Sequence, residues 1–353
     1  MASVSSLQSA WSILTELDVR DLQESIRQPF PVAVIGRDAA ARTWLANALY
    51  TDPFSHRMLP VGPYTVIFPL PLSGDQRLAA ARSRLVFVAI PAGQENLDLE
   101  RETIQDLLGL NPQLAIIVVQ IRPGAAQEMV APMLAHWPGA TEIILDPEED
   151  QPFDAEFVPA LKRLAPDSEV LLGYHFPGLR PALARQLVRQ TSLANAGYAA
   201  ATGVAEIVPI FLIPGNVADF VVLTKNQALM AYKIALLMGN DIAVQEMIGE
   251  LAGVLGGGYL LREAARRLVG IIPGWGLIPK VAIAYAGTYL IGEAVTYWYA
   301  YHEKLTAAQM KVIYARALAE GREKAAGILA RRQRQQEHTS GWFRRKLPKR
   351  KQT

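Results

Sequence analysis

In the first half of the chain, short apolar runs alternate with stretches whose apolar residues recur at helical spacing. The apolar runs have the length and the branched-residue content of buried strands, and they occupy residues 31–36, 64–68, 84–90, 114–121 and 141–146. The stretches with helical spacing occupy residues 41–50, 97–109, 125–136 and 155–164. Apolar strands separated by helices are typical of a mostly parallel sheet covered on both faces. We therefore predict an α/β domain over residues 29–165, preceded by an amphipathic N-terminal helix within residues 1–28.

From about residue 166 the pattern changes. Residues 166–190 have the composition of a linker, and residues 191–330 form long helical stretches rich in alanine, glycine and leucine. Two of these stretches, 203–224 and 268–301, are unusually apolar. The fold class that we predict is therefore α/β followed by all-α, with a basic tail over residues 331–353.

Composition sets limits on the chemistry. With 353 residues, 51% of them hydrophobic and 19% charged, the chain is long enough for two domains and too apolar to be disordered. The absence of cysteine excludes disulfides, thiolate zinc sites and thiol nucleophiles. The five histidines are scattered, and no spacing indicates a metal site. No G-x-S-x-G turn supports a covalent hydrolase.

The net charge of +2 conceals an uneven distribution. Residues 331–353 contain nine lysines and arginines and one acid, Glu337, so the tail carries +8. The remaining 26 basic and 32 acidic residues leave the rest of the chain at −6. A mildly acidic body does not attract polyanions, whereas the tail does.

A strand, a glycine, a short loop and a helix at residues 31–50 are where a phosphate-binding loop would lie. The working pattern is G-x-x-x-x-G-K-[ST], and here the stretch reads GRDAAART. Gly36 and Thr43 match the pattern, whereas Ala41 replaces the second glycine and Arg42 replaces the lysine. Arginine keeps the charge on a bulkier planar group, so this exchange is not conservative.

The segments that follow resemble the Era/Der type of small GTPase. The resemblance rests on residues 84–124, RLVFVAIPAGQENLDLERETIQDLLGLNPQLAIIVVQIRPG, a strand, an acidic helix and a second strand. In that family the second strand ends in N-K-x-D, which recognises guanine. The corresponding residues here are Gln120, Ile121, Arg122 and Pro123. The D-x-P-G motif, whose aspartate orients magnesium, falls on Pro69, Leu70, Pro71 and Leu72, of which only Pro71 matches.

Three nucleotide motifs are therefore altered together. We expect a domain that no longer hydrolyses GTP and needs no cofactor. Residual binding of GTP and magnesium stays open, because Gly36 and Thr43 at a helix N-terminus could still hold an anion. An atypical slow GTPase, in which Arg42 replaces the lysine and Thr43 or Thr51 assists the metal, is the alternative.

The second half resembles the YcjF-like bacterial domain of unknown function, which often follows Era/Der-like GTPase domains. The resemblance covers about residues 190–325 and rests on 213–239 (IPGNVADFVVLTKNQALMAYKIALLMG) and 274–299 (GWGLIPKVAIAYAGTYLIGEAVTYWY). It implies association with a membrane and no agreed activity. The fold expectation thus includes one or two membrane-spanning or re-entrant helices.

The composition of the two apolar stretches gives a stricter test of whether they span a membrane. A spanning helix needs about 20 predominantly apolar residues, and charges or prolines interrupt both stretches, among them Lys280 and Glu293. Peripheral attachment and a bundle with an alanine-rich core therefore stay open as alternatives. Small residues favour close helix packing and self-association, and they include Ala282, Ala284, Ala286 and Gly287.

The tail favours a membrane. Two aromatic residues stand beside a cationic run, and together these proposed anchoring residues are Trp342, Phe343, Arg344, Arg345, Lys346, Lys349, Arg350 and Lys351. Aromatic rings partition into the headgroup region, and basic residues bind anionic lipids. The positive-inside rule places the tail on the cytoplasmic side of a bacterial inner membrane. A solvated tail, or one that contacts nucleic acid, is the less favoured alternative.

Together these features predict a non-enzymatic, membrane-associated pseudo-GTPase that acts as a scaffold or regulator. Its expected partners are an anionic membrane surface, a further copy of the chain and a protein that the sequence does not identify. The alternatives are the slow membrane GTPase and a nucleic-acid-binding protein that uses the tail.

Overall fold

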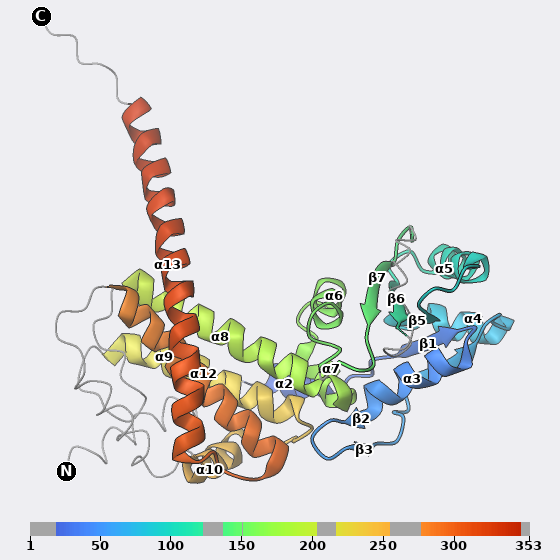
Figure 1. The fold of residues 1–353 in the computed structure, drawn as a ribbon, viewed down its shortest axis with the longest axis horizontal. Coiled ribbons are helices and arrows are strands. Elements are labelled where there is room, and N and C mark those ends of the chain that lie inside the picture. The colour runs from blue at the N-terminus through green and yellow to red at the C-terminus, as the bar shows by residue number, and fades with distance from the viewer. Residues whose placement is uncertain (1–18, 123–136, 150, 203–216, 255–276, 347–353) are drawn as a thin grey trace, which may run out of the picture. The chain divides into compact units, whose positions relative to one another are not determined.

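The structure is a computed structural model that describes residues 19–122, 137–149, 151–202, 217–254 and 277–346. The chain divides into two compact units (Figure 1). The sheet unit contains Asp18–Arg185 and Lys233–Asp241, and the helical unit contains Gln186–Tyr232 and Ile242–Thr353. An α/β region followed by a mostly helical region confirms the predicted order of fold classes.

The sheet unit has five parallel strands in the order β4-β1-β5-β6-β7. The strands are β1 (Val32–Gly36), β4 (Thr65–Pro69), β5 (Leu85–Pro91), β6 (Ala115–Ile121) and β7 (Thr141–Leu145). A two-residue antiparallel pair, β2 (Thr51–Asp52) with β3 (Arg57–Met58), lies outside this sheet. The register places Val32 beside Thr65 on one side and Leu85 on the other. The predicted mostly parallel sheet is confirmed.

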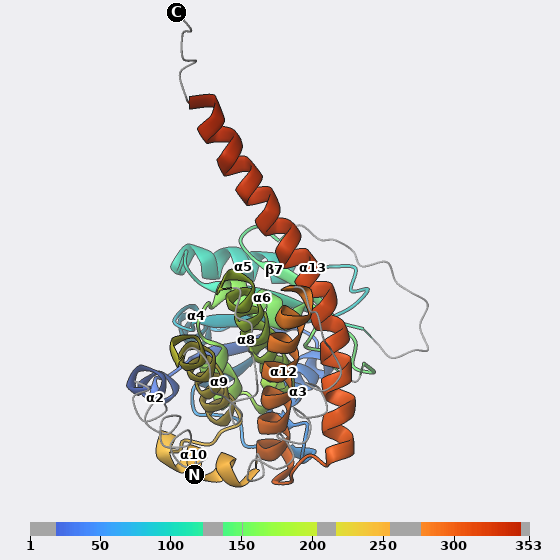
Figure 2. The same ribbon diagram turned by 90° about the vertical axis from the view of Figure 1, so that its left-hand side faces the viewer.

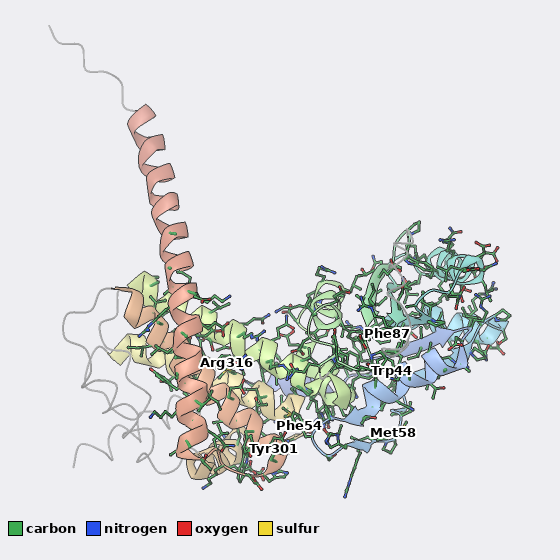
Figure 3. All side chains as sticks on the ribbon, viewed as in Figure 1. Trp44, Phe54, Met58, Phe87, Tyr301 and Arg316 are labelled. Atoms are coloured by element: carbon green, nitrogen blue, oxygen red, sulfur yellow. The ribbon has the colours of Figure 1, made fainter. Side chains whose placement is uncertain are left out.

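Both faces of the sheet are covered by helices. The helices of this unit are α2 (Arg20–Arg27), α3 (Ala39–Tyr50), α4 (Gly74–Ala81), α5 (Asp98–Leu110), α6 (Phe157–Leu164), α7 (Glu169–His175), η1 (Pro177–Leu179) and the start of α8 (Arg180–Thr202). On one face, alternate residues of the strands pack with α4 and α5 in a single apolar cluster. On the other face lies Phe87 of β5, which Figure 3 labels. Its ring stacks on the ring of Phe157 of α6, with 5.3 Å between the centroids.

The connections between the parallel strands indicate where this sheet could bind a ligand. The connection from β1 through α3 leads to β4, whereas the connection from β4 through α4 returns past β1 to β5. Right-handed crossovers in opposite directions place α3 and α4 on opposite faces. The carboxyl end of β1 is therefore a topological switch point, the position at which open parallel sheets bind ligands.

The helical unit is organised around α12 (Leu277–Tyr301). It also contains α10 (Val244–Val254), α13 (Ala307–Lys346), most of α9 (Val217–Leu237) and most of α8. Within α12, no residue from Val281 to Ala300 is exposed. A helix that is apolar on every side must be covered on every side, and in this unit protein helices cover it. Gly292 of α12 lies against Val188 of α8, and α13 packs along α12 (Figure 2).

No helix in the described part of the chain is both long and apolar enough to cross a bilayer. The part of the 268–301 stretch that is described forms α12, whose apolar surface is buried within its own unit. Residues 203–216 and 268–276 of the two apolar stretches lie outside the described residues. The expected spanning or re-entrant helices therefore stay a prediction for those segments.

Two further boundaries can be compared with the sequence. Of the amphipathic helix expected within residues 1–28, the structure describes α2, and residues 1–18 lie outside the described part. The segment 166–190 forms α7, η1 and the start of α8. At the other end, α13 continues to Lys346, so much of the basic tail is helical.

Candidate functional site at the carboxyl end of β1

The loop after β1 is shorter than a phosphate-binding loop requires. Only Arg37 and Asp38 separate Gly36, the last residue of β1, from Ala39, the first residue of α3. In the working motif, four residues and a second glycine precede the lysine, so that backbone N–H groups surround the phosphates. Here Ala41 and Arg42 already lie in the first turns of the helix.

Gly36 is required by the packing of the sheet. A Cβ added to Gly36 would lie 2.4 Å from the backbone oxygen of Ala89 on β5. The carbonyl oxygen of Gly36 accepts a hydrogen bond of 3.2 Å from the backbone nitrogen of Leu70, which follows β4. The glycine that matched the nucleotide motif thus has a structural role between three neighbouring strands.

Asp38 caps α3 with its own carboxylate. Its Oδ1 accepts a hydrogen bond of 2.7 Å from the backbone nitrogen of Ala41. The N-terminus of a helix carries unpaired N–H groups and a positive dipole end, and it is the natural place for a bound anion. In this protein a side-chain carboxylate of the same loop occupies that place.

Arg42 turns back onto the loop. Its Nη1 donates a hydrogen bond of 2.6 Å to the carbonyl oxygen of Gly36, and it lies 3.5 Å from that of Asp38. A lysine at this position of the motif would instead reach the outer phosphates. Ala41 is buried and Thr43 is exposed on α3. The structure therefore places Gly36, Ala41 and Arg42 around a loop that is filled by protein atoms.

A buried carboxylate fastens this loop to the next one. Glu100 of α5 is completely buried, and its Oε1 lies 3.4 Å from Nε of Arg37 and 3.0 Å from Nε2 of Gln94. Arg37 also donates to the backbone oxygen of Asn96. The side chain of Arg37 is 42% exposed, so solvent weakens this ion pair. The contacts join the loop after β1 to the loop after β5.

α3 is also held at its carboxyl end. The hydroxyl of Tyr50 is 2.6 Å from Oγ1 of Thr65 on β4. Burial raises the pKa of Tyr50, while its hydrogen bond to Thr65 opposes this rise. The helix that follows the candidate site is therefore fixed to the sheet at both ends.

Residues 69–72, which align with the magnesium-binding D-x-P-G motif, form an apolar segment. Leu70 is buried in the cluster below α4 and α5, and Leu72 packs against the same cluster. Ser73 then caps α4, with its hydroxyl accepting from Gln76. Pro69 and Pro71 supply no oxygen side chain. Across the part of the chain that the structure describes, no group of histidine and carboxylate residues could hold a metal ion.

Residues 120–122, which align with the start of the guanine-specificity motif, make their contacts with β7 and the residues around it. Gln120 is buried and its amide donates to Glu142. Arg122 lies 4.0 Å from Asp146 through its guanidinium, and its backbone nitrogen donates to the oxygen of Leu145. Both residues therefore connect β6 to β7. Pro123 lies outside the described residues.

Three residues of this site were not found from the sequence. For Asp38 a signal exists, because aspartate before a helical pattern is a common N-cap. Arg37 and Glu100 have no such signal, since their sequence spacing gives no hint that two loops meet. The proposed anchoring residues Trp342, Phe343, Arg344, Arg345 and Lys346 are positions of α13. Lys349, Arg350 and Lys351 lie outside the described residues.

Comparison of the chain with family models, with curated proteins and with solved structures found no match. The likenesses to Era/Der-type GTPases and to the YcjF-like domain therefore stay predictions.

Proposed function

We propose that this protein is a non-enzymatic, membrane-associated pseudo-GTPase that acts as a scaffold or regulator on the cytoplasmic face of a bacterial inner membrane. The proposal rests on two features. In the sheet unit, protein side chains fill the position where a nucleotide would bind. The helical unit ends in a basic segment. The described part of the sheet unit is compatible with a P-loop-like domain, because β1 is an interior strand and its loop lies at the switch point.

One observation carries the proposal: the loop after β1 satisfies its own polar groups. The carboxylate of Asp38 accepts from the first turn of α3, and the guanidinium of Arg42 donates to the carbonyl of Gly36. A bound phosphate would have to displace Asp38 and meet its negative charge. Loss of an N-cap alone costs about 1 kcal/mol, and the repulsion adds to this cost.

The other two motifs support the same conclusion. Magnesium prefers oxygen ligands, whereas residues 69–72 supply none from their side chains. Guanine recognition in the GTPase family uses an aspartate, and Pro123 stands in its place. A domain without these groups has no means to neutralise the charge that develops during phosphoryl transfer.

Membrane attachment is proposed through the basic residues at the end of the chain. In this proposal the apolar residues of α12 pack against other helices of the helical unit and do not contact lipid. Re-entrant or spanning helices are retained only for the parts of the two apolar stretches that lie outside the described residues, 203–216 and 268–276. Self-association is proposed through small residues that remain open. Gly287 is the best candidate for such a contact between copies, since an added Cβ there meets no atom within 4 Å. Ala282 is not available, because it already packs against Gly321 of α13.

A nucleotide-binding measurement tests the proposal. We expect no binding of fluorescent GTP or GDP by the purified full chain, with or without magnesium, and no phosphate release. The variant Arg42→Ala separates the alternatives: a slow GTPase loses its activity, whereas a pseudo-GTPase has none to lose. Micromolar affinity for GTP together with turnover in the unmodified chain would overturn the proposal.

Sedimentation tests the membrane half. We expect the protein to pellet with membranes, and a carbonate wash then distinguishes peripheral from integral attachment. Protein that stays in the supernatant with anionic vesicles present contradicts the proposed localisation, whatever the result with nucleotides.

A further inference from the structure

The last helix is longer than the helix it packs against. Gly321 of α13 lies against Ala282 of α12, where an added Cβ would approach the oxygen of Ala282 to 2.9 Å. Only residues 302–306 connect the two helices, so they run antiparallel. Position 277, five residues before Ala282, is therefore level with position 326, five residues after Gly321. α13 continues for 20 residues past that position, to Lys346.

The packed face and the open face of α13 can be followed along the sequence. Ala317, Gly321 and Ala325 are buried and recur every four residues, so they define the face against α12. Lys324 is exposed, as are Arg322 and Glu323. A line of positions that begins at Lys324 thus starts on the solvent side of the helix.

That line carries mainly cationic residues. Steps of seven, three, four, four and three residues return to nearly the same side of an α-helix. From Lys324 these steps reach Arg331, Arg334, His338, Trp342 and Arg345, which we call the basic stripe. Arg332 and Arg344 neighbour the stripe residues Arg331 and Arg345 in the sequence but fall on other sides of the helix. Arg332 continues the line of Ala325.

We propose that the basic stripe is a docking surface for an anionic phospholipid bilayer, with α13 lying along the headgroups as a continuous helix. This inference rests on the proposed membrane attachment and adds to it the residues and the geometry. From residue 331 to the end of the helix, Glu337 is the one acid, and it falls off the stripe. The charge of the stripe therefore complements an anionic surface.

The composition of the stripe favours a bilayer over nucleic acid. Trp342 lies between Arg334 and Arg345 along the stripe, and tryptophan is enriched at the level of lipid headgroups. Trp342 is the one large apolar residue among the stripe positions, so attachment is mainly electrostatic. Electrostatic attachment at a surface is reversible and weakens as salt screens the charges.

Paired substitutions at neighbouring positions test the stripe. The first variant is Arg331→Gln with Arg345→Gln, and the control is Arg332→Gln with Arg344→Gln, which removes the same charge. Each basic residue near an anionic leaflet strengthens binding about fivefold. We expect the first variant to lose about thirtyfold in partition onto vesicles of phosphatidylglycerol and phosphatidylethanolamine, and the control to lose only a few-fold. Vesicles of phosphatidylcholine alone should bind neither.

Site-directed labelling gives a second measurement. Because the chain has no cysteine, a single introduced cysteine can carry an environment-sensitive dye. Dyes at Gln335→Cys and His338→Cys, on or next to the stripe, should shift to the blue on vesicles. Dyes at Gln333→Cys and Ser340→Cys, on the opposite side, should remain in water.

The outcomes separate the inference from the proposed function. Equal losses in the two double variants, with equal dye shifts, would mean that the segment acts as a flexible polycation; the stripe is then wrong, and membrane attachment stands. Absence of binding to anionic vesicles by the unmodified chain contradicts both. Tighter, salt-sensitive binding to RNA or duplex DNA than to vesicles would assign the stripe to nucleic acid and overturn the inference.

Discussion

The two units bury apolar surface in different ways. The sheet unit places large branched and aromatic side chains between a parallel sheet and its helices. The helical unit instead brings helix backbones close together through small residues, as where Gly321 meets Ala282 and Gly292 meets Val188. Large side chains exclude water by their volume, whereas small ones allow polar groups on neighbouring helices to reach each other.

In the helical unit, polar side chains of three neighbouring helices hydrogen-bond to one another. Asn195 of α8 and Gln227 of α9 both donate to Oγ1 of Thr288 on α12, at 3.0 and 3.1 Å. Asn226 donates to Asn195 at 2.8 Å. Such a network fixes the register of three helices whose small side chains would otherwise slide past one another. In the sheet unit, register follows from the strand ladder itself.

The largest expected effect concerns the sheet unit. Gly36→Ala places a Cβ 2.4 Å from a backbone oxygen of β5, which cannot rotate away. We expect a loss of about 3 kcal/mol in the free energy of unfolding, measured by urea denaturation. Gly109→Ala on α5 is the control, because its Cβ meets nothing within 4 Å, and it should stabilise by up to ~1 kcal/mol. Equal effects of the two substitutions would remove the packing role of Gly36.

The corresponding substitution in the helical unit should cost less. Gly321→Ala brings a Cβ to 2.9 Å from the oxygen of Ala282, and α13 can shift outward to relieve part of the overlap. We expect a loss of about 2 kcal/mol in the free energy of unfolding. Gly327→Ala, whose Cβ meets nothing within 4 Å, serves as the control. If Gly321→Ala proves neutral, the close contact of Gly321 with Ala282 does not contribute to the packing of α13 on α12.

The smallest of the three effects concerns the buried network. Thr288→Val keeps the shape but leaves the amide donors of Asn195 and Gln227 facing a methyl group, so we expect a loss of about 1.5 kcal/mol. Thr296→Val is a matched control on the same helix, since the buried Oγ1 of Thr296 has no hydrogen-bond partner among the described residues. That control should be neutral or stabilising. Thermal unfolding of both variants side by side decides whether the network contributes specifically.

Much of the sheet could be predicted from the sequence. The strand patterns at 31–36, 84–90 and 114–121 differ by one residue from β1, β5 and β6 at one or both ends. These strands are buried on both faces, and such burial demands a continuous apolar run that polar loops must interrupt. The β2–β3 pair was not predicted, because two residues per strand leave no periodicity to detect.

The candidate site was less predictable. The altered residues at 36–43 and 120–123 were visible as departures from a motif, but their present roles were not. Asp38 as a cap, Arg42 on the carbonyl of Gly36 and Arg37 against Glu100 depend on where a short loop bends. An ion pair between residues 63 positions apart, such as Arg37 with Glu100, leaves no trace in local spacing.

The order of strands and helices and the lack of oxygen-bearing side chains at residues 69–72 can be read from the residue types, because both are local properties of the chain. Tertiary structure alone decided what covers the apolar residues of α12. Hydropathy measures only aversion to water, and lipid and protein satisfy it equally well. For the loop after β1, the residue types show that the second glycine and the lysine of the phosphate-binding pattern are missing, and only the folded chain shows the carboxylate of Asp38 at the N-terminus of α3.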